Sequence, residues 1–155
     1  YFFSDFRYQP VVMTAITTFE GPRAVTGRVA NISPQGFDYS LQEEEYSLES
    51  HPPEIVGYIA WEPSTGKLDG TQFAVALAHD ITHKPQNIKF AQLFANSPSF
   101  LASMQTCHGG DTANLRYDRK TKRGLKINVS EENSLDDEIN HTTESVGYIA
   151  LHSVR

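Results

Sequence analysis

The feature that most constrains how this chain folds is a ten-residue stretch that occurs twice. HPPEIVGYIA occupies residues 51–60, and HTTESVGYIA occupies residues 141–150. The five residues VGYIA, one histidine and one glutamate are common to both copies. Such similarity within 155 residues indicates a tandem duplication. We therefore expect the two halves of the chain to fold alike.

The duplication extends well upstream of the decamer. Aromatic, proline, glycine and arginine positions coincide at an offset of 88 residues, and a two-residue insertion in a polar loop then changes the offset to 90. One insertion is enough to align the whole unit. The matching pairs include Phe2/Phe90, Phe6/Phe94, Pro10/Pro98, Thr18/Thr106, Gly21/Gly109, Arg28/Arg116 and Gly36/Gly124.

We divide the chain into a first unit, residues 1–62, and a second unit, residues 68–155. The turn-rich stretch EPSTGKLDG, residues 62–70, is interpreted as a linker that interrupts any strand. The second unit carries additional sequence before Phe90. We expect the counterpart of that sequence in the first unit to lie upstream of Tyr1.

Each unit consists of short segments with strand character, separated by turns. PVVMTAITTF (10–19) and SFLASMQTC (99–107) are strand candidates, and apolar and polar residues alternate in GFDYSLQEE (36–44) and GLKINVSEE (124–132). No segment shows a convincing helical period. The sequence therefore predicts an all-β fold, an antiparallel β-sandwich with four or five strands in each unit.

The composition argues against several functional classes. A net charge of −6, from 13 basic and 19 acidic residues, is unlike that of a nucleic-acid-binding protein. No apolar run is long enough to span a membrane. Cys107 is the only cysteine, so an internal disulfide is impossible, and we expect this residue to be buried. Sequons at Asn31, Asn128 and Asn140 matter only if the protein is secreted by a eukaryote.

The run F-x3-F-x3-PVVMTAITTF…GRVANISPQGF…VGYIAWE resembles the H-type lectin domain of snail agglutinins and related invertebrate and slime-mould lectins. The resemblance covers nearly all of the first unit and most of the second. It implies a compact β-sandwich, commonly trimeric, that binds a galactose-type sugar. The chain also resembles H-lectin-like repeats in large secreted bacterial proteins. We accordingly expect a glycan partner, self-association, a secreted or cell-surface location and no enzymatic activity.

The resemblance also suggests where a ligand would bind, although the residue types differ from those of the family. The family's aromatic–histidine pair is replaced here by Glu44-Glu45 and Glu132-Asn133, its aspartate falls near Asp80, and its arginine falls beside Arg23 or Asp111. The two histidines of the decamers join this set because they recur with the acids. The candidate ligand-binding residues are Arg23, Glu44, Glu45, His51, Asp80, Asp111, Glu132, Asn133 and His141.

The acids and histidines around the decamers allow three interpretations. The first is a structural network that ties loops to strand ends through charge-assisted hydrogen bonds. The second is a calcium site on Glu43, Glu44 and Glu54, and no other cofactor is expected. The third is a ligand site in which carboxylates accept hydrogen bonds from sugar hydroxyls. The network interpretation assigns structural roles to Arg28, Glu43, Glu54, Arg116, Glu131 and Glu144.

Two catalytic interpretations are weaker. Glu43 and Glu44 point to opposite faces of a strand, so they cannot be a glycosidase pair, and a small sandwich leaves little room for a cleft between Glu43 and Glu54. The HDITH sequence at residues 79–83 lacks the glutamate of zinc proteases. Two alternatives to a lectin remain: a structural repeat of a fibre, coat or surface array, and a fragment of a carbohydrate-active enzyme.

Overall fold

The computed structural model of the chain describes residues 1–47 and 50–153, and every regular element in those ranges is a β-strand. The prediction of an all-β antiparallel fold is confirmed. The strands are β1 (Val11–Ile16), β2 (Val25–Ala30), β3 (Asp38–Glu43), β4 (Val56–Trp61), β5 (Ser64–Leu68), β6 (Thr71–Ile81), β7 (Gln86–Lys89), β8 (Ser99–Met104), β9 (Ala113–Asp118), β10 (Gly124–Glu131) and β11 (Glu144–Ser153).

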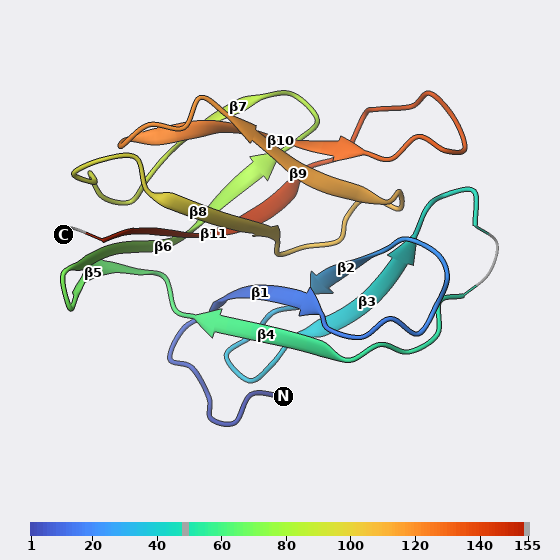
Figure 1. Cartoon of the computed structure of the whole chain (residues 1–155), viewed down its shortest axis with the longest axis horizontal. Helices are drawn as coiled ribbons and strands as arrows, with labels where there is room; N and C mark the ends of the chain where they lie inside the picture. Colours follow the sequence, from blue (N-terminus) through green and yellow to red (C-terminus); the bar gives the residue numbers. More distant parts are fainter. Residues whose placement is uncertain (48–49, 154–155) are drawn as a thin grey trace.

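These strands form antiparallel sheets that are stacked in layers. The second unit contains a four-stranded sheet in the order β5-β6-β11-β8, which faces a three-stranded sheet in the order β7-β10-β9. The first unit contributes two smaller sheets, β1-β4 and β2-β3. In Figure 1 the three-stranded sheet lies at the top, the four-stranded sheet below it, and the first unit at the bottom.

The two units share one scheme of strand pairing. Val11 pairs with Trp61 across β1 and β4, and at the sequence offsets Ser99 pairs with Leu151 across β8 and β11. The register of β2 on β3 is likewise reproduced by β9 on β10. The repeat in the sequence is thus accompanied by a repeat in backbone pairing. The boundaries at residues 62 and 68 stay a prediction, and residues 154–155 of the second unit lie outside the described residues.

The stretch interpreted as a linker is in fact a β-hairpin, which corrects the sequence analysis. Strand β5 pairs with β6 so that Leu68 lies opposite Thr71, with only Asp69 and Gly70 between them. Both turn residues have positive φ angles, 45° and 82°. This is the backbone that an Asp-Gly pair favours in a two-residue hairpin turn. The turn signal is real, but the stretch does not interrupt strand structure, because residues 64–68 form a strand and Asp69-Gly70 form its hairpin turn.

Two apolar clusters hold the layers together. The larger one fills the sandwich of the second unit, between β6-β11-β8 and β7-β10-β9. The smaller one joins the units, because Val11 of β1 packs on the outward face of β6 and β11 at Val75 and Ile149. Trp61 belongs to this junction and packs against Phe73, with ring centroids 5.0 Å apart. The two units therefore form one continuous body.

Candidate functional site

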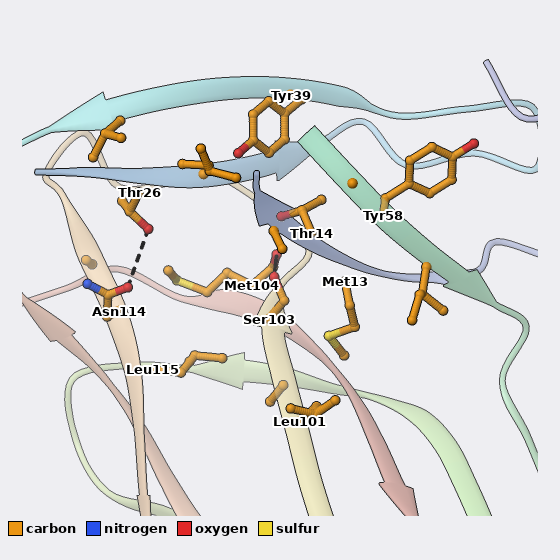
Figure 2. A pocket seen from close by; sticks show the side chains of 18 residues that line it. Met13, Thr14, Thr26, Tyr39, Tyr58, Leu101, Ser103, Met104, Asn114 and Leu115 are labelled. Atoms are coloured by element: carbon orange, nitrogen blue, oxygen red, sulfur yellow. Dashed lines mark hydrogen bonds between the residues drawn. The ribbon is translucent and has the colours of Figure 1, made fainter. Parts of the chain in front are cut away.

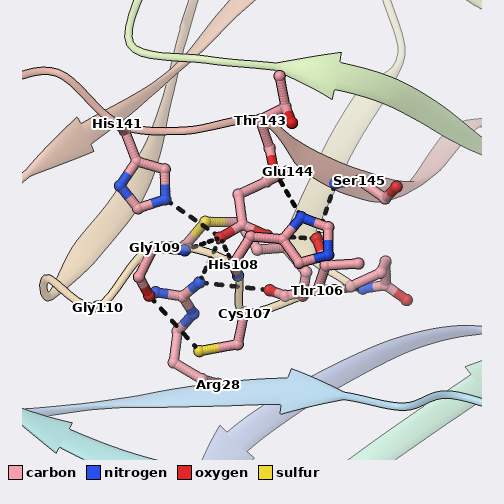
Figure 3. Close-up of polar contacts among 12 residues, drawn as sticks. Arg28, Thr106, Cys107, His108, Gly109, Gly110, His141, Thr143, Glu144 and Ser145 are labelled. Carbon is pink, nitrogen blue, oxygen red and sulfur yellow. Dashed lines mark hydrogen bonds and ion pairs between the residues drawn. The ribbon is translucent and has the colours of Figure 1, made fainter.

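The glutamate of the second decamer lies at the centre of a buried polar network (Figure 3). The Glu144 carboxylate accepts hydrogen bonds from the Thr106 hydroxyl, from His108 N at 3.0 Å and from Gly109 N at 3.3 Å. It also forms an ion pair with Arg28 of β2, with 2.9 Å between Arg28 Nη2 and Glu144 Oε1. The network thus fastens the turn after β8 to the start of β11, and fastens the first unit to both.

The histidine of the same decamer lies between two carboxylates. His141 Nδ1 is 2.6 Å from Glu131 Oε1, and its Nε2 is 3.1 Å from Glu144 Oε1. Gly109 faces this ring so closely that a Cβ at that position would clash with His141 Cε1. Because the His141 side chain is fully buried, this candidate ligand residue is enclosed by the network.

The first unit repeats most of this arrangement. The Glu54 carboxylate accepts hydrogen bonds from the Thr18 hydroxyl and from Glu20 N, the latter at 2.9 Å. His51 Nε2 lies 3.8 Å from Glu54 Oε1. The arginine does not repeat: Arg116 is exposed on β9 and forms no ion pair with any described residue. The structure therefore brings Arg28, Glu131 and Glu144 into one network, but leaves Arg116 outside it.

These contacts fix the direction of the pKa shifts. Burial alone raises the pKa of Glu144, but hydrogen bonds from Thr106, His141, His108 and Gly109 outweigh it, so the pKa is lowered. In the first unit the Thr18 hydroxyl and the Glu20 backbone N–H lower the pKa of Glu54. Both decamer glutamates are thus held as carboxylates. Glu144 accepts hydrogen bonds from the loop after β8, and Glu54 accepts them from the loop after β1.

Several other predicted ligand residues line one acidic pocket of about 700 Å³ at the junction between the units. Glu44 and Glu45 enter it from the loop after β3, and Asp111 enters it from the loop before β9. His51 and Glu43 also contribute to the wall. Residues distant in the sequence, and from both units, therefore meet at one surface.

The Glu45 carboxylate lies close to several other carboxylates. Burial and the neighbouring carboxylates, Asp111 and Glu132 first among them, raise the pKa of Glu45. Glu132 is instead held by donors: its carboxylate accepts hydrogen bonds from Glu45 N at 2.8 Å and from Ser134 N. These bonds lower the pKa of Glu132. Glu132 therefore connects the loops of the two units, while Glu45 lies among like charges.

The remaining candidates are dispersed. Arg23 Nη1 contacts the Ser47 hydroxyl at 3.0 Å, and that hydroxyl also bonds to Glu43, so Arg23 borders the pocket. Asn133 is exposed in the loop after β10. Asp80 lies outside the pocket, at a register shift of β6 against β11, with a φ angle of 59°. Aspartate is among the few residues that tolerate this left-handed conformation. The structure thus gives Asp80 a backbone role in the bulge.

A second, more apolar cleft of about 770 Å³ was not anticipated from the sequence (Figure 2). Met13 and Tyr58 line it from the first unit, and Leu101 and Leu115 from the second. It lies between equivalent strands, and the Thr26 hydroxyl contacts Asn114 Oδ1 at 3.4 Å across it, between positions 88 residues apart. Outward-facing apolar positions on β1 and β8 were the available signal, but periodicity does not reveal which outward faces meet.

Three further findings bear on function. Within residues 1–47 and 50–153, no group of three or more His, Cys, Asp or Glu side chains is arranged to hold a metal ion. Among the same residues, no helix is long and apolar enough to cross a membrane. Cys107, expected to be buried, is only half-buried, because it lies in the turn of His108 and Gly109 rather than in β8.

No family model matches the chain, and no solved structure matches it significantly. The chain is 30% identical over 154 residues to Halomucin from Haloquadratum walsbyi. The match covers 97% of this chain but only 2% of the relative's length. The resemblance to H-type lectins therefore stays a prediction.

Proposed function

We propose that this chain is a non-enzymatic extracellular module that binds a carbohydrate in the acidic pocket between its two units. The observation that carries the proposal is the convergence of Glu44, Glu45, His51 and Asp111 on one pocket. All four are among the ligand-binding residues that the sequence predicts. Both units are needed to form the pocket, which gives the duplication a functional reason.

The chemistry of the pocket suits a sugar. Ionised carboxylates only accept hydrogen bonds, and sugar hydroxyls donate them. The volume, about 700 Å³, lies within the range of small-molecule sites. Tyr39 and Leu41 add apolar surface to the wall, which complements the apolar side of a sugar ring. Arg23 lies nearby and supplies a cationic donor for a ring or acetamido oxygen.

The extracellular placement and the sugar class rest on different support. Similarity to a protein named as a mucin supports a secreted or cell-surface location. The galactose-type sugar and self-association are proposed from the resemblance to H-type lectins alone.

A glycan-array screen of the intact chain, with and without EDTA, tests the proposal. We expect binding to a defined class of sugar that is lost in the variant Glu44→Gln and retained in Glu20→Gln. The second variant removes the same charge from an exposed position outside the pocket. We expect binding to persist in EDTA, because no group of three or more His, Cys, Asp or Glu side chains among the described residues is arranged to hold a metal ion. Absence of binding under both conditions contradicts the proposal.

A second candidate is a purely structural repeat within a surface assembly. The observation that favours it is the network itself, because both decamer glutamates have their acceptors occupied by the protein's own donors. On this account the pocket carboxylates serve only to keep the surface charged. The glycan screen separates the two candidates. If the chain is only a structural repeat, it binds no sugar, and Glu44→Gln changes no binding signal.

A further inference from the structure

Strand β4 of the first unit and its equivalent β11 of the second differ in the number of neighbours. β11 pairs with β8 along one edge and with β6 along the other. Among the described residues, β4 pairs with β1 alone. The β1-β4 pairing reproduces β8-β11, so the edge of β4 without a partner is the one equivalent to the β6 edge of β11.

The same sequence, VGYIA, is therefore buried in one unit and open in the other. Tyr148 and Ile149 are 2% and 5% exposed in β11, whereas Tyr58 and Ile59 are 43% and 60% exposed in β4. In β11, Ile149 lies opposite Val75 of β6. An open strand edge with exposed apolar side chains is a surface that pairs readily with another strand.

The backbone that leads to this edge is already in place. Phe2 N bonds to Gln35 O at 2.9 Å, as Phe90 N bonds to Arg123 O at 2.9 Å. A Cβ on Gly36 would lie 3.2 Å from Tyr1 Cα, just as one on Gly124 would lie 3.1 Å from Lys89 Cα. Residues 1–6 therefore follow the path of residues 89–94. A segment equivalent to β6 and β7, joined in front of Tyr1, would run toward the open edges of β4 and β3.

We propose that the open edge of β4 is the acceptor for a β6-type strand donated by a preceding repeat of the same polypeptide. The register follows from β6 on β11: the strand runs antiparallel to β4, its residue equivalent to Ala74 lies opposite Ala60, and its residue equivalent to Val75 lies opposite Ile59. Neighbouring repeats are then linked by shared sheets. The inference rests on strand pairing and not on the proposed carbohydrate site, but the two adjoin, because Glu54 and Val56 line the acidic pocket and lie opposite the far end of the donated strand in this register.

Hydrogen exchange on an extended chain tests this inference. A copy of residues 64–88 is placed directly before Tyr1, as the offset of 88 requires. We expect the amides of β4 to exchange about tenfold more slowly than in the unextended chain. The control carries Ala74→Asp and Ala76→Asp in the added copy only, which places charges on its inner face and abolishes the protection. Slow amide exchange in β11 serves as an internal control, because it shows that the second unit is folded in every variant.

A disulfide experiment tests the register. In a Cys107→Ser background, Ala60→Cys is combined with Ala74→Cys in the added copy, where directly opposite residues on one face allow a disulfide. The matched control moves the second cysteine by one position, to Val75→Cys, which turns it to the other face of the sheet. The proposal is supported if the first pair forms a cross-link and the control pair does not. Unchanged exchange in β4, or equal cross-linking of both pairs, overturns it.

Discussion

Arg28 and Glu144 form a buried ion pair across the junction of the two units, with 2.9 Å between Arg28 Nη2 and Glu144 Oε1. They are 116 residues apart in the chain, and their side chains are 1% and 0% exposed. Arg28 Nη1 additionally donates to Gln42, and its Nη2 donates to Thr106 O. A pair so deeply buried adds little over apolar packing, but breaking it leaves a charge without its partner.

Removal of the carboxylate is the first test of this pair. Glu144→Gln leaves the Arg28 guanidinium buried without its counter-charge, and we expect the free energy of unfolding to fall by roughly 3–5 kcal/mol. Glu54→Gln is the matched control, since Glu54 holds the equivalent place in the first unit without an arginine. Urea denaturation measures both. An equal loss of unfolding free energy in the two variants would show that the ion pair with Arg28 is not the cause of the loss in Glu144→Gln.

Acid is expected to destabilise the protein through the same group. Because the folded pKa of Glu144 is lowered, its contribution is fully present above the unfolded value of about 4.3 and is lost as the pH falls through the folded pKa. Unfolding free energies measured between pH 7 and pH 3 should therefore decrease below about pH 4.3. The Glu144→Gln variant should show a shallower decrease, and an identical pH profile argues against this assignment.

Two adjacent glycines provide a steric test. Gly109→Ala places a methyl group against the His141 ring, and we expect a loss of about 1–3 kcal/mol from the crowding. Gly110→Ala meets no atom within 4 Å and should change stability by no more than about 0.5 kcal/mol. Thermal unfolding followed by circular dichroism distinguishes the two. Similar melting temperatures for both variants would place the His141 ring elsewhere.

Glu45 should behave in the opposite sense to Glu144. Its folded pKa is raised by burial and by the surrounding acids, so its ionised form opposes folding, and that penalty grows as the pH rises through the folded pKa. Glu45→Gln is therefore expected to stabilise the protein at pH 7 and to have little effect at pH 4. Denaturation midpoints at the two pH values check the sign. A destabilised variant at pH 7 contradicts it.

The sequence predicted the architecture better than the site, for physical reasons. Repeats and apolar alternation are local signals, so the strands around VVMTAI and GLKINVSE and their equivalence between units could be anticipated. The Asp69-Gly70 hairpin was misread because a turn residue pair looks the same whether it joins strands or domains. Long-range geometry decided the rest.

The site residues illustrate that difference. Arg28 and Arg116 are equivalent in sequence, yet only Arg28 faces Glu144, because the junction covers one face of the first unit and leaves β9 exposed. Duplication implies equal inheritance, but packing of the two copies against each other makes their surroundings unequal. The two decamer histidines differ less: both side chains are almost fully buried, but only His51 also lines the acidic pocket.

The most direct test of the carbohydrate proposal is an NMR titration of the isotopically labelled chain with galactose, N-acetylgalactosamine, glucose and mannose. We predict saturable shifts for at least one sugar, concentrated on the amides of Glu44, Glu45 and Asp111 around the acidic pocket. The absence of saturable shifts with every sugar, or shifts confined to the apolar cleft around Met13 and Leu101, would contradict the account.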